Sequence, residues 1–185
     1  MDVKNLSDEE LVAKILEKDQ ELYGEIISRY QSKLSHYLRK FIRDHDELED
    51  VLQDVFIKTY KNLYGFNRNK KFSSWIYRIA HNEAINAIKK NKRGQINLDE
   101  VEYKLIGEKL ALEEKIDLKF KKDDIILALE KVKLKYKEAI LLFYFEGASY
   151  DDISDILRIP KNTVGTYISR GRKELKQILL KNYGR

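Results

Sequence analysis

The 185-residue sequence contains no cysteine, a single proline and only eight glycines. The lack of cysteine excludes disulfide bonds, thiolate metal sites and a cysteine nucleophile. The scarcity of proline and glycine leaves few of the turn residues that β-hairpins need, whereas the abundant Leu, Lys and Glu favour helices. We therefore expect an all-α protein.

Long apolar runs are also missing from the sequence. No stretch approaches the ~18 consecutive apolar residues of a membrane-spanning helix. The N-terminal residues MDVKNLSDEELVAKIL lack the basic start and the unbroken apolar run of a signal peptide. These absences predict a cytoplasmic protein without membrane insertion.

Charged residues are abundant and are segregated by sign. They make up 36% of the chain, against about 25% in an average protein. Residues 44–57 contain six acidic side chains and no Lys or Arg, whereas residues 60–93 contain nine Lys or Arg and one Glu. Residues 97–118 are acidic again, and residues 158–185 are basic. Such blocks are either solvated faces or a sign of several charged partners, such as a nucleic acid and a basic protein.

Apolar residues at helical spacing divide the chain into two parts. Ser7 and Glu10 fit a capping box at the start of the first helix. Residues 94–122 lack a sustained apolar period and have an acidic bias, which predicts a flexible linker with transient helix. We therefore predict two small helical domains around this linker, an N-terminal bundle over residues 1–93 and a C-terminal helix-turn-helix domain over residues 123–185.

The segment SYDDISDILRIPKNTVGTYISRGRKELKQIL, residues 149–179, joins an acidic helix to a basic one. Pro160 prevents the first helix from continuing, and a second helix is expected from about Asn162. Its outward residues are polar or basic, as in a recognition helix that enters the major groove of DNA. Ordinary packing of a helical hairpin remains an alternative. The outward residues are Thr163, Thr166, Ser169, Arg170 and Lys173, with Arg172 at the flank.

Another acidic cluster lies on a predicted helix of the N-terminal domain. Glu47, Asp50 and Asp54 are three and four residues apart, so their carboxylates share one side of that helix. The three histidines, at positions 36, 45 and 81, have no spacing that is typical of metal ligands. We therefore expect neither a metal site nor hydrolytic catalysis from this cluster.

Aromatic and basic residues alternate in the segment that follows. Such a combination offers base stacking and phosphate attraction to single-stranded nucleic acid, although each ring could equally be a core anchor. The aromatic residues are Tyr64, Phe66, Phe72, Trp75 and Tyr77, and the basic ones are Arg68, Lys70, Lys71 and Arg78. On the next helix Arg78, Asn82, Asn86 and Lys89 form a polar stripe that is either a contact surface or a solvated face.

Three segments together resemble a known family. They are EDVLQDVFIKTYKNL, FNRNKKFSSWIYRIAHNEAINAIKK and KEAILLFYFEGASYDDISDILRIPKNTVGTYISRGRKELK. In order and spacing they are similar to the extracytoplasmic-function (ECF) class of bacterial sigma factors, in the sigma-70 family, and the match covers nearly the whole chain. The resemblance implies two conserved domains, regions 2 and 4, joined by a linker that threads toward the channels of RNA polymerase.

The resemblance also implies roles for individual residues. The residues that the resemblance implies dock on RNA polymerase core are Asp50, Gln53 and Asp54. The loop from Phe66 to Ser74 is expected to capture a base flipped from the -10 element, and the -10 contacts are Phe66, Asn67, Arg68, Lys71, Phe72, Trp75, Arg78, Asn82 and Asn86. The implied -35 contacts are Thr163, Thr166, Tyr167, Arg170, Arg172 and Lys173.

Four residues depart from the family pattern. Family members often have Ala at the place of Ser154, Gly near Arg158, and basic residues at the places of Gly165 and Tyr167. Tyr167 either replaces an Arg contact or packs inward. The departures leave the predicted fold in place but alter the expected -35 contacts.

The predicted function is that of a non-catalytic promoter-specificity subunit without a cofactor. Its expected partners are RNA polymerase core, promoter DNA and an anti-sigma factor, and the free protein is expected to be monomeric. One alternative is an independent helix-turn-helix regulator, which would dimerise on paired half-sites. Another is a nucleic-acid enzyme, for which the sequence offers no metal or nucleophile constellation.

Overall fold

The computed structural model describes residues 3–17, 19–42, 44–91 and 122–183. Within these ranges all regular structure is helical, and no strand occurs. The chain divides into two compact units, Met1–Gly94 and Gln95–Arg185. The predicted all-α fold with two domains is therefore confirmed. The predicted linker lies outside the described residues except for its last residue, Lys122, which begins a helix.

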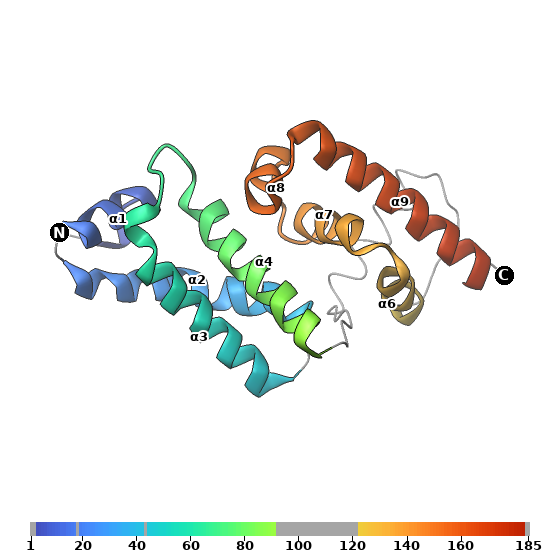
Figure 1. Cartoon of the computed structure of the whole chain (residues 1–185), viewed down its shortest axis with the longest axis horizontal. Coiled ribbons are helices and arrows are strands. Elements are labelled where there is room, and N and C mark those ends of the chain that lie inside the picture. Colours follow the sequence, from blue (N-terminus) through green and yellow to red (C-terminus); the bar gives the residue numbers. More distant parts are fainter. Residues whose placement is uncertain (1–2, 18, 43, 92–121, 184–185) are drawn as a thin grey trace. The chain divides into compact units, whose positions relative to one another are not determined.

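The N-terminal unit is a bundle of helices (Figure 1). Helices α2, α3 and α4 pack against one another, and α1 lies against α2 and α4. Three short 3-10 turns connect or precede the helices, at Val3–Asn5, Gln20–Leu22 and Leu63–Gly65. The helices are α1 (Asp8–Leu16), α2 (Tyr23–Arg39), α3 (His45–Lys61) and α4 (Phe72–Asn91).

The starts of these helices follow local capping chemistry. The predicted capping box of Ser7 and Glu10 is confirmed at α1. Asp44 caps α3 by accepting a hydrogen bond from the backbone N–H of Glu47, 2.9 Å away. At α4, the backbone N–H of Phe72 donates to the Glu9 carboxylate at 2.8 Å. Because this carboxylate comes from α1, the start of α4 depends on a distant part of the chain, and the local sequence does not reveal it.

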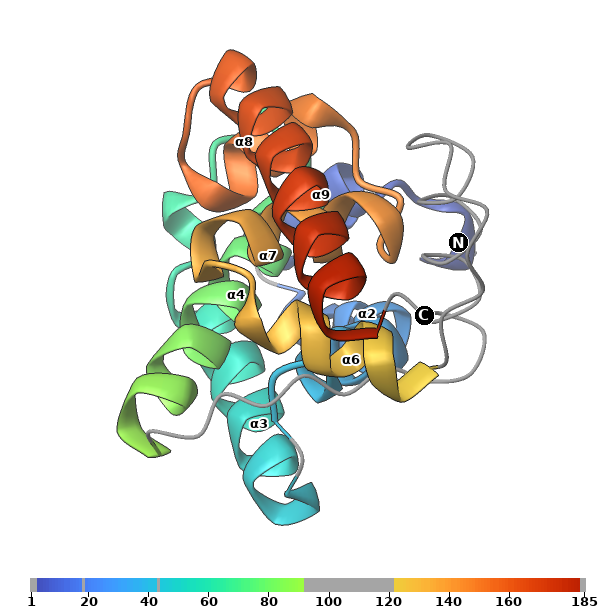
Figure 2. The same ribbon diagram turned by 90° about the vertical axis from the view of Figure 1, so that its right-hand side faces the viewer.

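The C-terminal unit is organised around its last and longest helix. Helices α6 (Lys122–Lys131), α7 (Leu134–Tyr144) and α8 (Tyr150–Leu157) all pack against α9 (Lys161–Tyr183), as Figures 1 and 2 show. The apolar stripe of α9 is buried along its whole length, at Val164, Ile168, Leu175 and Leu179. The predicted helix-turn-helix therefore rests on a small core of its own.

A glycine allows the close approach of α7 and α9. A side chain at Gly171 would place its Cβ 2.7 Å from Ile140 Cδ1 and 3.0 Å from Tyr136 Cβ. Real Cβ atoms do not approach other atoms this closely, so the two helices touch through the bare backbone at this point. The contact fixes how far α9 stands from α7.

The turn between α8 and α9 is held by polar contacts. Ser149 and Asp152 form a capping box at the start of α8. The Ser154 hydroxyl donates to the Ile159 carbonyl at 2.6 Å, and the Pro160 carbonyl accepts from the backbone N–H of Thr163 at 2.8 Å. Ser154, one of the departures from the family pattern, thus ties α8 to the turn, a bond that alanine cannot make.

Arg158 at the end of α8 has a left-handed backbone, with φ of 55°. This conformation costs a non-glycine residue about 1–2 kcal/mol, whereas glycine adopts it freely. We expect Arg158→Gly to raise the free energy of unfolding of the C-terminal unit by about 0.5–1 kcal/mol, after the greater entropy of glycine in the unfolded chain is subtracted. Denaturant titration of the full chain measures this change, with Arg158→Ala as the control that should bring no gain.

Candidate functional site

One face of α3 carries exposed carboxylates. Asp50, Gln53 and Asp54 are all exposed and lie on the same side of the helix. Within the described residues, neither the Asp50 nor the Asp54 carboxylate has a hydrogen bond or an ion pair. Ile57, one turn further, continues this face and is 49% exposed. We call these four residues the acidic face.

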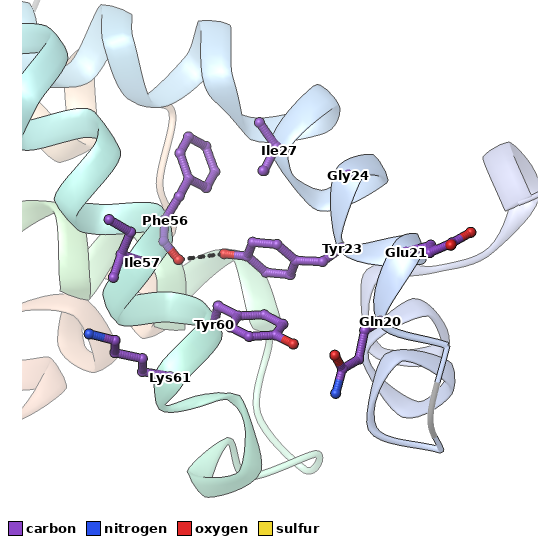
Figure 3. A pocket seen from close by; sticks show the side chains of 9 residues that line it. All are labelled: Gln20, Glu21, Tyr23, Gly24, Ile27, Phe56, Ile57, Tyr60 and Lys61. Atoms are coloured by element: carbon purple, nitrogen blue, oxygen red, sulfur yellow. Dashed lines mark hydrogen bonds between the residues drawn. The ribbon is translucent and has the colours of Figure 1, made fainter.

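An apolar groove lies at the C-terminal end of the acidic face, between the start of α2 and the end of α3 (Figure 3). Its volume is about 570 Å³. The Tyr23 hydroxyl donates to the Phe56 carbonyl at 2.7 Å, and the Tyr23 ring meets the Tyr60 ring edge to face at 4.9 Å. Burial raises the pKa of Tyr23, so its hydroxyl stays protonated and keeps this bond. The predictions from sequence did not include this groove.

Two aromatic residues predicted to touch DNA are instead buried in the core. Phe66 is 6% exposed and Phe72 is 0% exposed. Their rings meet edge to face at 5.5 Å, and both lie within 5.6 Å of the Trp75 ring. This burial removes Phe66 and Phe72 from the side chains that can stack on a base. They hold the loop between α3 and α4 in place, while Trp75 remains partly exposed.

The polar residues of that loop point outward. Asn67 folds the chain back by accepting a hydrogen bond from the backbone N–H of Asn69 at 2.9 Å. Arg68, Lys70 and Lys71 are exposed. Tyr64, just before the loop, is 81% exposed, the largest exposure among the big apolar side chains that the structure describes. The loop thus presents cations to solvent, and the exposed Tyr64 ring lies just before it, whereas the rings of Phe66 and Phe72 are buried.

A polar stripe runs along α4 from this loop. Trp75, Arg78, Asn82 and Asn86 fall within about 80° of one another around the helix axis. Asn82 and Asn86 are exposed, and Trp75 and Arg78 are partly exposed. The opposite side of α4 is buried through Ile76, Ala80, Ala84 and Ala87. The structure therefore places these four predicted residues on one solvent-facing side.

The first half of α9 presents a second polar surface. Thr166, Arg170 and Lys173 are exposed, and Thr163 is partly exposed. The Thr166 hydroxyl donates to the Asn162 carbonyl one turn back at 3.0 Å. These four residues, here called the recognition surface, occupy the side of α9 opposite its buried stripe.

The side chains of Arg172 and Tyr167 contact α7, unlike the solvent-facing residues of the recognition surface. Arg172 borders the buried stripe, and its guanidinium lies 3.5 Å from the Tyr144 hydroxyl on α7. The prediction that Arg172 faces DNA is therefore not supported by its position. The Tyr167 ring packs edge to face on Tyr136 at 5.3 Å, with Lys135 Nζ 5.6 Å from the Tyr167 ring centre. Of the two alternatives for Tyr167, the structure shows packing, although the residue remains partly exposed.

Arg170 on the recognition surface is linked to the same cluster. It hydrogen-bonds to Tyr136, which lowers the pKa of that phenol. Gly165 has a related packing role, since a Cβ there would lie 3.2 Å from the Tyr150 ring on α8. The two departures from the family pattern on α9, Gly165 and Tyr167, thus both lie against a tyrosine ring, that of Tyr150 and that of Tyr136.

The described residues contain no group of three or more His, Cys, Asp or Glu side chains that could hold a metal ion. His81 is buried, and its Nδ1 lies 2.9 Å from the Tyr37 hydroxyl. Burial lowers the pKa of His81 to about 4, so the imidazole is neutral at pH 7 and serves packing. A membrane-spanning helix was not found in the described part of the chain either.

Comparison with known proteins matches both units to one family. Residues 26–94 match the family described as Sigma-70 region 2, and residues 122–175 match Sigma-70, region 4. The ECF RNA polymerase sigma factor SigW of Bacillus subtilis is 30% identical over 176 residues, which cover 91% of this chain and 94% of the relative.

Two solved structures share the fold. CnrH in complex with the cytosolic domain of CnrY matches with a TM-score of 0.68 and 20% identity, covering 95% of this chain and 98% of that one. The sigma factor RpoE of Bartonella quintana, in complex with the anti-sigma factor NepR, matches with a TM-score of 0.60 and 19% identity, covering 86% and 98%. The chain therefore belongs to the sigma-70 family of RNA polymerase sigma factors, in the ECF class.

Proposed function

We propose that this sigma factor binds RNA polymerase core through the acidic face of α3 and recognises promoter DNA through α4 and α9. The observation that carries the first part is the pair of exposed carboxylates, Asp50 and Asp54, without a partner among the described residues. Carboxylates left without a cation in the free protein suit a basic partner, because no internal ion pair must be broken on binding.

The loop and stripe around α4 suit the melted -10 element. Trp75 offers a partly exposed ring for a base, and the cations of Arg68 and Lys71 attract phosphates. Asn82 and Asn86 follow on the same side of α4, where their amides can donate to and accept from bases or backbone. Flipping a base costs a few kcal/mol, so several such contacts are needed to offset it.

The recognition surface of α9 suits duplex -35 DNA. A second helix of a helix-turn-helix enters the major groove with its first turns, and here those turns carry Thr163, Thr166 and Arg170. Arg170 suits a guanine edge or a phosphate, and Lys173 suits a phosphate. The Tyr167 ring of α9 packs on the Tyr136 ring of α7, and this contact holds the start of α9 against its domain.

Regulation by an anti-sigma factor is part of the proposal. The related RpoE was solved with the anti-sigma factor NepR, which supports an anti-sigma factor as a partner of this chain as well. The protein acts where polymerase and promoters meet, in the cytoplasm, as an initiation factor without catalysis of its own.

Reconstitution tests the proposal. We expect the purified chain to co-elute one to one with sigma-free RNA polymerase core and to direct transcription from a subset of genomic DNA fragments. The free chain should be monomeric and should bind duplex DNA poorly. A dimer that binds paired half-sites tightly and ignores the core enzyme would instead identify an independent helix-turn-helix regulator.

A further inference from the structure

Two tyrosines of α7 each meet an arginine of α9. The Tyr144 hydroxyl lies 3.5 Å from the Arg172 guanidinium, which borders the buried stripe of α9. The Tyr136 hydroxyl is hydrogen-bonded to Arg170. The two arginines differ in exposure, because Arg172 is partly exposed whereas Arg170 is exposed on the recognition surface. Of the two pairs, the one with Tyr136 therefore places an anchored cation where DNA is proposed to bind.

The Tyr136 ring is held in place in the free protein. The residue is 7% exposed, and its ring packs edge to face on Tyr167 at 5.3 Å. Gly171, next to Arg170 in sequence, lets the helices approach closely here, since a Cβ on it would lie 3.0 Å from Tyr136 Cβ. Helix α9 thus contacts the ring through Tyr167 and the hydroxyl through Arg170, three residues further on the same side. This support restricts the orientations that the guanidinium can adopt.

A phenol holds a guanidinium without neutralising it. Arginine has only donors, so the Tyr136 oxygen accepts this hydrogen bond. The bond from Arg170 and the charge of nearby Lys135 lower the pKa of the Tyr136 phenol. Among the described residues, no carboxylate pairs with Arg170. The guanidinium therefore keeps its charge and has further N–H donors left for a ligand.

Anchoring of this kind favours a contact with a base edge over one with a phosphate. A guanine presents its two major-groove acceptors in one plane and one direction, so a bidentate arginine must meet it in one orientation. A phosphate offers oxygens in several directions and accepts an arginine in more orientations. An unanchored arginine loses rotamer freedom when it binds, whereas an anchored one has lost much of it already. The contact with the stricter geometry gains most from the anchor.

We infer that Tyr136 is a positioning residue, which holds the Arg170 guanidinium in the orientation that reads the edge of one base pair in the -35 element. This inference rests on the proposed function, because it names the residue that sets specificity at the same recognition surface. Since Tyr136 is itself buried, it acts through Arg170 and not by touching DNA.

Tyr136→Phe tests the inference, because it removes the hydroxyl and keeps the ring that packs on Tyr167. Holoenzyme reconstituted with each full-length variant transcribes a library made from a promoter fragment that wild type transcribes, with the -35 element randomised. Sequencing of a transcribed barcode gives the base preference at every position. Arg170→Ala identifies the base pair that Arg170 reads, as the one at which the preference disappears. If this variant initiates too weakly, Arg170→Lys takes its place, since lysine keeps the charge but lacks the planar fork.

We expect wild type to prefer one base at that pair by at least about 10-fold. Tyr136→Phe should lower this preference by at least about threefold, because the freed guanidinium must be ordered on binding. Preferences at the other positions should stay within about twofold of wild type. The double variant Tyr136→Phe, Arg170→Ala should show no loss beyond that of Arg170→Ala, since the hydroxyl acts through the guanidinium.

Tyr144→Phe is the matched control. It removes a hydroxyl from the other tyrosine–arginine pair between the same two helices, where the arginine does not belong to the recognition surface. We expect it to leave every base preference within about twofold of wild type. Thermal melting of the free chains compares the stability of both variants. A tyrosine with a purely structural role would affect melting without changing the preference at one base pair.

The outcomes separate the inference from the proposed function. If Tyr136→Phe lowers the preference at the Arg170 pair by less than about threefold, or flattens all positions equally, Tyr136 does not position Arg170 and the proposed function stands. If Arg170→Ala changes no preference although wild type discriminates at the -35 element, Arg170 does not read a base and the inference is wrong. If the wild-type holoenzyme shows no preference at any -35 position, the inference and the proposed reading of DNA by α9 are both wrong.

Discussion

Replacing Asp50 and Asp54 together by lysine is expected to lower the affinity for RNA polymerase core by at least about 100-fold, which corresponds to about 2.7 kcal/mol. Both side chains are exposed on α3 and have no cationic partner within the described residues. Reversing two charges that face a basic partner replaces attraction by repulsion, which costs several kcal/mol. Titration of labelled protein with sigma-free core, by anisotropy, measures the loss.

The helix itself should tolerate this change. Asp50 and Asp54 are four residues apart and already repel each other, so two lysines at the same spacing replace one like-charged pair by another. The Asp50→Asn, Asp54→Asn variant is the graded control and should bind between wild type and the double lysine variant. Because the contact is between exposed charges, wild-type affinity should fall as salt is raised, and the affinity of the asparagine variant should fall less. Equal affinity of all three proteins would show that the acidic face does not contact the core.

The sequence predicted the helical scaffold well because local signals dominate in it. The capping boxes at Ser7 and Ser149, the single proline and the apolar stripes each act within a few residues along the chain. Such signals can be recognised without knowledge of the tertiary fold. The same holds for the exposure of Asp50 and Asp54, since nearby cations are lacking in the sequence itself.

Whether an individual aromatic or basic side chain is buried or exposed could not be predicted from such local signals. Phe66 and Phe72 are spaced like contact residues, yet the Phe72 ring packs against Tyr30 on α2, a distant part of the bundle, as well as against Trp75 one turn along its own helix. Arg172 lies between two residues of the recognition surface in sequence, Arg170 and Lys173, but turns toward Tyr144 on α7. These outcomes depend on how distant helices approach one another, which periodicity along one helix does not encode.

The groove was missed for the same reason. Its two walls, at Tyr23 and Tyr60, come from the start of one helix and the end of another, and the rings meet only in the folded chain. One signal was nevertheless visible in the sequence. Ile57 continues a face that is otherwise acidic or polar, at a position three residues after Asp54. A large exposed apolar residue at the end of a charged face is a reason to look for an interaction site.

The substitution Trp75→Ala is expected to slow promoter opening by about 10- to 100-fold, because stacking of one base on an aromatic ring is worth about 1–3 kcal/mol. Trp75 is the member of the Phe66, Phe72 and Trp75 cluster that remains partly exposed, at the start of the polar stripe of α4. The Phe66 and Phe72 rings pack against the indole of Trp75 and restrict its orientation, while part of the indole remains exposed to solvent. Open-complex formation by the reconstituted holoenzyme, on a promoter fragment that wild type transcribes, measures the rate.

Two controls separate stacking from packing in this experiment. Phe66→Leu disturbs the same cluster from its buried side, so it should lower the melting temperature yet leave the opening rate within a few-fold of wild type. A promoter with a premelted -10 region removes the cost of unpairing and should narrow the difference between Trp75→Ala and wild type. If Phe66→Leu slows opening as much as Trp75→Ala does, the cluster acts by holding the loop rather than by stacking. If neither variant slows opening, the start of α4 does not take part in melting, and the -10 contacts must be sought further along the stripe, at Asn82 and Asn86.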